Sequence, residues 1–349
     1  MHFILVLLLL SFSAAINASD HAAVSAFKDV ISGNTIATTA WTGDNFCVWP
    51  GIYCDPNTLR VTDIVLRADD SSDSVVGDKK LDLSGSWTGL LSNSLCLLDQ
   101  LTTLIITDWN SISGEIPPCI TSLSQLRIVD LSGNRISGEI PSEIGKLTQL
   151  IVLDLGGNQI SGSIPTSIVN LQNLKLLDVS NNQLTNEIPS DIGQLKMLSR
   201  VLMGRNQLTG SIPGSLAGLT RLADLDLSMN RISGSVPDAI GSMPVLSTLN
   251  LYGNELSGEV PGSLFGNKGL SHLNLSRNFL EGNLPDSFGS ESYFTALDLS
   301  YNKLNGEVPK SLGSVKYMGV LDLSNNDFQD QQGIARNGCF WYCFPQCDC

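Results

Sequence analysis

Residues 150–165 read LIVLDLGGNQISGSIP, and this stretch decides the fold. Its arrangement of apolar residues, Asn, Gly and Pro returns every 24 residues along most of the chain. The Gly position is filled by Gly114, Gly138, Gly162, Gly210, Gly234, Gly258, Gly282 and Gly306, with Asn186 at the one point that lacks Gly. A second column holds Asn at every point from Asn134 to Asn326. A register kept over eight periods indicates a repeat architecture.

Each position of the repeated unit has a physical reason. Leu153 and Leu155 alternate with Asp154, so we expect the Leu side chains to face inward from a short strand and Asp154 to face outward. The Asn amide can satisfy backbone groups that the bending coil leaves unpaired. The Gly position needs a positive φ, for which Asn is the usual substitute. The pattern predicts a right-handed, curved leucine-rich repeat solenoid of about ten coils, with a parallel concave sheet and an N-terminal helical cap.

The chain divides into five expected parts. Residues 3–10 are a short apolar run followed by small residues, which is typical of a secretory signal with cleavage after Ala15. A helix is expected over residues 20–32 with Asp20 as its N-cap, and a first strand over 59–66. The predicted parts are a signal peptide at 1–15, a cap at 16–66, an exposed acidic loop at 67–80, repeats at 81–328 and an atypical Cys-rich tail at 329–349.

Composition and charge exclude several classes of function. The 349 residues include 34 Asp and Glu against 20 Lys and Arg, which gives a net charge of −14. Phosphate backbones repel such a chain, so no nucleic-acid partner is expected. The three His residues argue against a His-based metal or acid–base centre, and we expect no metal and no cofactor. No later segment is apolar over a bilayer's width, so the sequence predicts a secreted monomer without membrane insertion.

Cysteine usage points to disulfides. An even count of eight in an exported chain favours disulfides over metal binding. Cys47 and Cys54 can close a small loop, and Cys96 and Cys119 lie 23 residues apart, close to one repeat, so they should meet on the convex side of neighbouring coils. The last four cysteines allow three pairings, and a metal site and an altered chain end are alternatives for Cys339, Cys343, Cys347 and Cys349.

An acidic column is expected on the concave sheet. The outward position of successive strands holds Asp130, Asp154, Asp178, Leu202, Asp226, Asn250, Asn274, Asp298 and Asp322. A basic partner would be attracted to this strip. The alternative is that each Asp bonds groups of its own repeat. The spacing of the carboxylates resembles that of a retaining glycosidase, but the repeat imposes it at every step and an open sheet excludes no water. The sequence therefore predicts no enzyme.

One coil breaks the acidic pattern. Residues 197–206 read MLSRVLMGRN, which places Arg200, Leu202 and Arg205 on the concave side. An apolar residue between two Arg is typical of interface centres, although scattered surface variation would give the same pattern. Four further residues are expected on this surface: Tyr252, His272, Arg277 and Tyr301.

A glycosylation sequon begins at Asn274, in the sequence Asn274-Leu275-Ser276. Because Asn274 belongs to a predicted concave strand, a glycan there would obstruct binding. A second sequon lies at Asn17, near the expected start of the mature chain.

These features resemble secreted plant leucine-rich repeat proteins. The resemblance rests on the S-G-x-I-P form of the repeat, the segment CVWPGIYC at 47–54 and the segment RVTDI at 60–64. Residues 108–134 and 193–213 are similar to DNA-damage-repair/toleration-type leucine-rich repeat proteins, which are related to polygalacturonase-inhibiting proteins. The resemblance implies a cell-wall or apoplastic location and, for the inhibitors, binding of pathogen enzymes on the concave strands. The family's Cys doublet is lacking, since Phe46 stands at its first position.

The sequence thus predicts a secreted, non-enzymatic protein-recognition module of the plant cell wall. Its protein partner would dock on the concave face, and the candidate activity is steric inhibition of a microbial wall-degrading enzyme. Two alternatives are a structural wall protein that binds polysaccharide and a ligand-binding partner of a membrane receptor. Binding of polyanionic pectin would need a cluster of Lys and Arg that the sequence does not contain.

Overall fold

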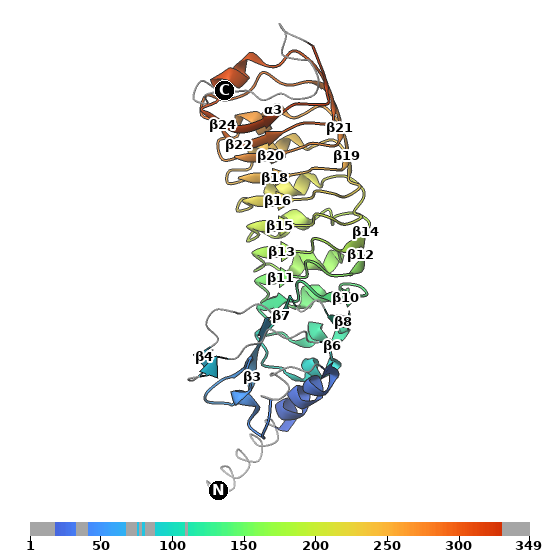
Figure 1. Ribbon diagram of the computed structural model, residues 1–349, viewed down its shortest axis with the longest axis vertical. Helices are drawn as coiled ribbons and strands as arrows, with labels where there is room; N and C mark the ends of the chain where they lie inside the picture. Colours follow the sequence, from blue (N-terminus) through green and yellow to red (C-terminus); the bar gives the residue numbers. More distant parts are fainter. Residues whose placement is uncertain are drawn as a thin grey trace. The chain divides into compact units, whose positions relative to one another are not determined.

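Short parallel strands, one in each repeat, build the main sheets (Figure 1). The computed structural model describes residues 18–32, 41–67, 75–76, 79–80, 88–108 and 111–329. The chain forms two units, Met1–Leu174 and Lys175–Cys349, and each is described by itself.

The first unit begins with a helix over residues 18–30. Its main sheet has the order β2-β3-β7-β9-β11 and its second sheet the order β1-β6-β8-β10. The strands are β1 (Ile31–Ser32), β2 (Ile52–Cys54), β3 (Val61–Arg67), β4 (Val75–Val76), β5 (Lys79–Lys80), β6 (Thr88–Leu90), β7 (Thr103–Thr107), β8 (Ile112–Glu115), β9 (Ile128–Asp130), β10 (Arg135–Ser137), β11 (Val152–Asp154) and β12 (Ser161–Ser163). Its 3-10 turns are η1 (Phe46–Val48), η2 (Asn93–Leu97), η3 (Pro118–Ser122), η4 (Ile144–Lys146) and η5 (Thr166–Asn170).

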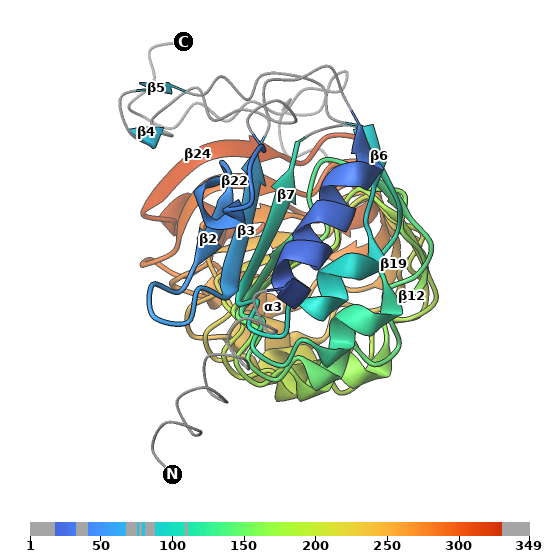
Figure 2. The same ribbon diagram turned by 90° about the horizontal axis from the view of Figure 1, so that it is seen from below.

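The second unit has a main sheet of order β13-β15-β16-β18-β20-β22-β24 and a second set of strands in the order β17-β19-β21-β23-β25. Its strands are β13 (Leu176–Asp178), β14 (Gln183–Thr185), β15 (Arg200–Leu202), β16 (Asp224–Asp226), β17 (Ser233–Gly234), β18 (Thr248–Asn250), β19 (Glu255–Gly258), β20 (His272–Asn274), β21 (Phe279–Asn283), β22 (Tyr293–Asp298), β23 (Lys303–Gly306), β24 (Tyr317–Asp322) and β25 (Asp327–Phe328). Its helical turns are η6 (Ile192–Gln194), η7 (Gly214–Gly218), η8 (Asp238–Ser242), α3 (Gly262–Gly266) and η9 (Lys310–Ser314). Figure 2 shows the main-sheet strands on one side and the helical turns on the other.

The repeat positions behave as the sequence predicts. Leu153 and Leu155 are buried, and Asp154 between them is half-buried on the outer face. From β9 to β11, and from β13 to β24, neighbouring strands pair in parallel at a constant offset of one repeat, so equivalent residues stand side by side. Leu202, for example, pairs with Asp226. The fold class predicted from the sequence, a leucine-rich repeat solenoid, is confirmed.

The Asn column closes the coils. Asn206 donates from Nδ2 to the carbonyl oxygens of Val179 at 2.9 Å and Met203 at 3.1 Å, and its Oδ1 accepts from the amide of Leu184 at 2.9 Å. The Nδ2 bonds recur down both units, and the buried members of the column are Asn134, Asn158, Asn206, Asn230, Asn254 and Asn278. The prediction that this Asn satisfies backbone groups is confirmed, and the other three members, Asn182, Asn302 and Asn326, are half-buried.

The Gly column has the left-handed backbone that the sequence predicts. Gly210 has φ +76°, and a Cβ added to it would lie 2.6 Å from Cγ of Glu187. Asn186, the exception in the column, has φ +64°. The column thus requires positive φ, and Asn is the residue that replaces Gly there.

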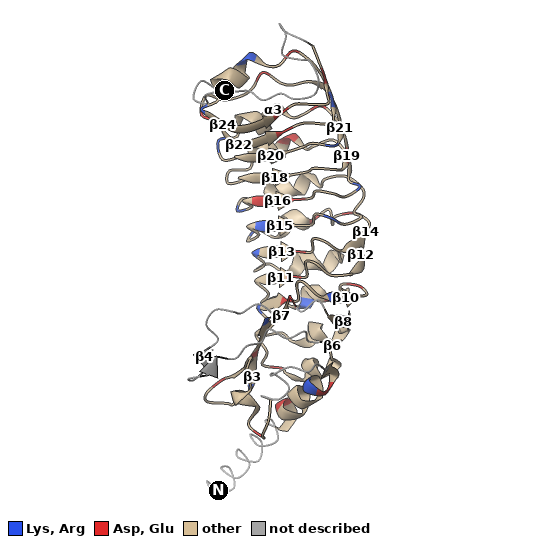
Figure 3. Ribbon diagram, viewed as in Figure 1, with Lys and Arg blue, Asp and Glu red and all other residues tan. Residues whose placement is uncertain are grey.

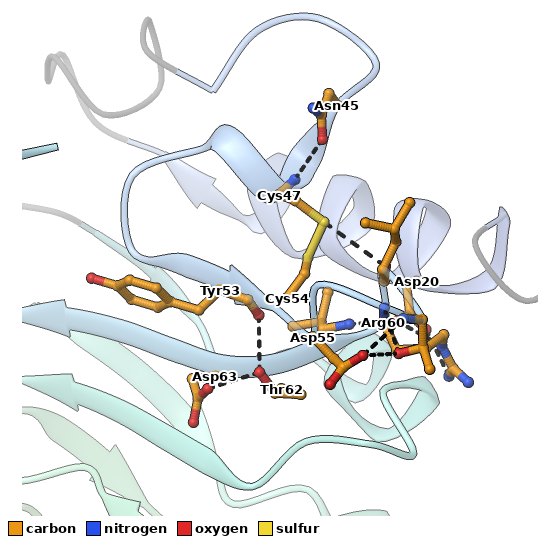
Figure 4. Close-up of a disulfide and its surroundings, with 12 residues drawn as sticks. Asp20, Asn45, Cys47, Tyr53, Cys54, Asp55, Arg60, Thr62 and Asp63 are labelled. Atoms are coloured by element: carbon orange, nitrogen blue, oxygen red, sulfur yellow. Dashed lines mark hydrogen bonds and ion pairs between the residues drawn. A yellow bond between two sulfur atoms is a disulfide. The ribbon is translucent and has the colours of Figure 1, made fainter. Parts of the chain in front are cut away.

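The N-terminal cap corrects one prediction. The helix covers residues 18–30, so Asp20 lies inside it and is not its N-cap. Asp20 is fully buried, accepts from Nε and Nη2 of Arg60 at 2.9 Å each, and accepts from the amide of Val61 at 2.8 Å. The hydrogen bonds from Arg60 to Asp20 raise the pKa of the guanidinium above its usual value. Asp20 therefore attaches the helix to β3, which spans Val61–Arg67 where a strand was expected over 59–66 (Figure 4).

The other predicted parts are described only in places. Within the expected loop at 67–80, β4 and β5 form an antiparallel pair, with Val75 opposite Lys80. The signal peptide at 1–15 and the four cysteines of the tail lie outside the described residues.

Two disulfides join the cysteine pairs that the sequence matched. Cys47 bonds Cys54 beside η1, and Cys96 bonds Cys119 between η2 and η3, on the helical side of the first unit (Figure 4 shows the first). Replacing Cys96 and Cys119 together with Ala is expected to lower the free energy of unfolding by about 2–4 kcal/mol, because the unfolded chain loses a cross-link. Denaturant unfolding with and without reductant measures this effect; a midpoint equal to that of the oxidised wild type would contradict it.

Candidate functional site

The acidic column has a structural role inside the repeats. In each case the carboxylate Oδ1 accepts from the backbone amide two residues later, as in Asp226 with Ser228 at 2.8 Å and Asp298 with Ser300 at 3.0 Å. The other bonds of this type belong to Asp130, Asp154, Asp178 and Asp322. Oδ2 of Asp226 also accepts from Nδ2 of Asn250 at 3.2 Å. The sequence allowed two roles for the column, attraction of a basic partner or bonding within each repeat, and these bonds are of the second kind.

Arg200, Leu202 and Arg205 follow one another on the outer face of the second unit. Arg200 and Leu202 bracket β15, whose Val201 points into the core. Arg200 Nε lies 3.2 Å from Oδ2 of Asp224 on β16, and Figure 3 shows positive and negative segments adjoining at these two strands. Leu202 is half-buried between the half-buried carboxylates of Asp178 and Asp226. Its side chain is thus partly accessible rather than fully exposed.

Tyr252 and His272 both belong to the second unit. Tyr252 is half-buried, in the loop that follows β18. His272 is exposed at the start of β20, where its ring nitrogens lie 3.1 Å from Oγ of Ser271 and 2.9 Å from Oγ1 of Thr295. The two hydroxyls hold the imidazole as a polar surface group.

Arg277 and Tyr301 come together from adjacent coils. The Arg277 guanidinium carbon lies 4.2 Å from the centroid of the Tyr301 ring, which is 46% exposed. The same two coils supply a second cation–π pair. Nζ of Lys303 lies 5.3 Å from the centroid of the Phe279 ring, and Phe279 is 51% exposed. Cation–π contacts of this kind orient the cationic groups without neutralising them. Arg277 and Tyr301 were predicted on this surface from the sequence, whereas Phe279 and Lys303 were not.

The glycosylation sequon lies on β20. Asn274 is half-buried, and its Oδ1 accepts from the amide of Ser276 at 3.0 Å and from the hydroxyl of Ser276 at 2.6 Å. Asn274 thus makes the same bond to the amide two residues later that Asp makes at this position in other coils. Glycosylation at Asn274 stays a prediction.

A second left-handed column was missed by the sequence analysis. The residue before each Asn of the repeat has positive φ, and in the second unit four of these residues carry large side chains: Arg205, Met229, Arg277 and Tyr301, with φ of 57°, 53°, 54° and 54°. The signal was present in the sequence, because Gly133, Gly157, Asn181, Gly253 and Asn325 occupy equivalent positions and are the residue types that adopt this conformation readily.

The described residues offer no metal site and no membrane span. Among them, no three His, Cys, Asp or Glu side chains are grouped so that they could hold a metal ion. None of the helices that the structure describes has the length and apolar character to cross a bilayer.

Comparison with known proteins places the chain among plant proteins of this fold. A segment of 117 residues is 50% identical to the DNA damage-repair/toleration protein DRT100 of Arabidopsis thaliana, and it covers 33% of this chain and 31% of that protein. The chain is 29% identical to the Arabidopsis receptor kinase HAESA, solved with the peptide hormone IDA and the co-receptor SERK1, with a TM-score of 0.68 over 88% of this chain and 54% of HAESA. It is 26% identical to a plant ice-binding protein, with a TM-score of 0.69 over 89% of this chain and 98% of the other.

The chain spans about a third of DRT100 and about half of HAESA. Residues 118–340 match the family described as "Leucine-rich repeat region". This match covers the repeats that carry the main-sheet strands and the Asn and Gly columns. The chain therefore belongs to the leucine-rich repeat family.

Proposed function

We propose that this chain is a protein-recognition module that acts outside the cell, and that its partner docks on the outer face of the main sheet in residues 175–329. The observation that carries the proposal is the rigid register of this face. From β13 to β24 the strands pair in parallel and present one outward side chain after another. A fixed surface of this kind loses little conformational entropy on binding.

The side chains on this face suit a protein partner. Leu202 offers an apolar centre, Arg200 and Arg205 stand on either side of it, and Tyr252 and Tyr301 add aromatic surface. Arg and Tyr are enriched at the centres of protein interfaces, and truncation of such anchors gives the largest losses of affinity. Docking on this face would act by covering the partner.

The similarity to HAESA supports this proposal, because that receptor is solved with a peptide hormone and a co-receptor protein. The two disulfides support an extracellular location, since disulfides form and persist in oxidising compartments. The cell wall is the location that the resemblance to secreted plant proteins implies.

We propose inhibition of a microbial wall-degrading enzyme as the first activity to test. A folded enzyme seated on the sheet would lose access to its polymeric substrate. Partnership with a membrane receptor is the second candidate, and the similarity to receptor ectodomains favours it. The two are separated by assaying purified microbial polygalacturonases with the chain added, and by testing receptor ectodomains for direct binding.

Replacing Leu202 with Asp is expected to weaken partner binding at least tenfold, because it places a third carboxylate between Asp178 and Asp226 and removes the apolar centre. Partners recovered from plant wall extract or from microbial culture filtrate are purified, and their affinity is measured by surface plasmon resonance. Ala239→Asp is the matched control, since Ala239 is exposed on η8, on the opposite side of the unit. Equal affinity of wild type and Leu202→Asp for every partner would reject the sheet face as the docking surface.

A further inference from the structure

The second left-handed column forms a distinct surface in the second unit. We call it the ridge, and it consists of Asn181, Arg205, Met229, Gly253, Arg277, Tyr301 and Asn325. Each residue follows a strand of the main sheet. From Asn181 to Tyr301 its amide donates to a carbonyl of the next coil, as Arg205 N does to Ser228 O at 2.8 Å and Arg277 N to Ser300 O at 2.9 Å. The ridge backbone is therefore as regular as the sheet beside it.

The large side chains of the ridge are held against backbone preference. A left-handed φ is unfavourable for L-residues other than Gly and Asn, and Gly253 shows that Gly fits this position. Arg205, Met229, Arg277 and Tyr301 occupy it nonetheless, and all four are exposed. Since no packing in the core requires these side chains, the strain at their backbone points to a role on the surface.

The two Arg residues of the ridge are without acidic partners. Within residues 111–329, neither Arg205 nor Arg277 takes part in an ion pair, whereas Arg200 on the sheet pairs with Asp224. The Arg277 guanidinium is instead stacked on the Tyr301 ring. Stacking fixes its plane and leaves its N–H groups available for a carboxylate.

The charges around the ridge are mixed. On the sheet side, Asp226 and Asp298 accept bonds from their own repeats. On the other side stand exposed Arg231, Glu255, Lys303 and Asp327, of which Lys303 contacts Phe279. The ridge itself holds two positive charges and no negative charge, although the whole chain carries −14. An acidic ligand therefore finds its complement along this line and not on the acidic column next to it.

Gly253 is the point of the ridge that carries no side chain, between Met229 and Arg277, and we call this point the notch. It has φ +68°, and a Cβ built on it would lie 2.9 Å from Sδ of Met229, so the Met229 thioether lies over this glycine. Half-buried Tyr252 precedes it. An apolar side chain of a ligand would contact Met229 at this place.

We propose that the ridge binds an acidic, extended segment of a partner protein, with carboxylates at positions i and i+4 and an apolar side chain at i+2. The inference rests on the proposed function and adds the chemistry of the partner. Arg205 and Arg277 are three coils apart, about 14 Å at the spacing of paired strands, and four residues of an extended chain span about 13 Å. Side chains at i, i+2 and i+4 point the same way, so the middle one faces Met229 and the notch.

The test uses a fluorescent ten-residue peptide with blocked termini, Glu at two positions four apart, Leu midway and Ser elsewhere. The full chain is expected to bind it in fluorescence anisotropy, and peptides with the two Glu two or seven positions apart are expected to bind about tenfold more weakly. Arg205→Gln and Arg277→Gln should each weaken binding by about tenfold or more, because each removes a charge-assisted bond. Arg231→Gln, which removes an equal charge outside the ridge, should change it less than about twofold.

A further variant, Gly253→Asn, tests the notch. Asn tolerates this backbone, as Asn181 and Asn325 show at equivalent positions, so the fold is kept while the notch is filled. It should weaken binding of the Leu peptide and leave a peptide with Ser midway unchanged.

Three results would overturn the inference. They are equal binding of all Glu spacings, equal loss in Arg231→Gln and Arg277→Gln, and binding of an oligogalacturonide in place of every peptide. The proposed function is judged separately. Suppose that Leu202→Asp abolishes binding of a purified protein partner while Arg205→Gln and Arg277→Gln still bind it. The ridge is then refuted as a binding site, and the sheet face remains the docking surface. If all three variants bind the partner as well as the wild type does, the sheet face is refuted as well.

Discussion

Replacing Asn206 with Ala is expected to lower the free energy of unfolding by about 3–5 kcal/mol. The side chain serves three buried backbone groups, the carbonyls of Val179 and Met203 and the amide of Leu184. A buried polar group without a partner costs about 1–3 kcal/mol, and entry of water recovers part of the sum. Because a coil buries its core only by stacking, the loss weakens the contacts of both neighbouring coils. Urea unfolding followed by circular dichroism measures the change.

Gln207→Ala is the control for this variant. Gln207 is the next residue, also carries an amide, and is exposed. Its replacement is expected to change the free energy of unfolding by less than about 0.5 kcal/mol. Equal effects of the two variants would show that the Asn column does not hold the coils together.

Replacing Asp20 with Ala is expected to destabilise the N-terminal cap by about 3–5 kcal/mol, because it leaves a buried cation without its counter-charge. The change removes both bonds from Arg60 and the bond from the amide of Val61. Arg60 retains Asp99, whose side chain is 66% exposed and which lies 2.5 Å from Nη2. The fluorescence of Trp41 and Trp49 reports the change, since both residues are buried in the cap. Trp41 stacks on Trp49 and lies 6.4 Å, between ring centroids, from Phe27 of the helix.

Asp99→Ala separates the buried pair from the exposed one. It removes one acceptor from the same guanidinium, but an exposed ion pair contributes at most about 1 kcal/mol. A loss as large as that of Asp20→Ala would place the stabilising contact at the surface and contradict the role given to Asp20.

The parts of the fold that the sequence predicted are those that repeat. Asn206 and Gly210 could be assigned because each stands in a column whose members share one environment. Asp20 could not be assigned, because it occurs once and its partner Arg60 is 40 residues away. The sequence near the helix start contains Ser and Asp, which are typical N-cap residues, and this local pattern led to the prediction that Asp20 is the N-cap. In the structure Asp20 instead forms the long-range ion pair.

The candidate site was predictable by position and not by contact. Alternation within β15 placed Leu202 on the outer face, since side-chain direction in a strand follows the period of two. Arg277 and Tyr301 follow β20 and β22, so this alternation does not determine where their side chains point. The stacking of Arg277 on Tyr301 depends on the left-handed backbone of both residues. Hydrophobic patterning carries no information about that conformation, and only the Gly and Asn residues at equivalent points reveal it.

The central claim is that a protein partner docks on the outer face of the main sheet. Hydroxyl-radical footprinting of the second unit, with and without a purified protein partner, tests this claim most directly. We expect the partner to protect Leu202, Met229, Tyr252 and Tyr301, and to leave the side chains of η7, η8 and η9 as reactive as in the free chain. Protection of those helical turns, with unchanged reactivity of the four sheet-side residues, would place the partner on the opposite side of the coils and contradict the account.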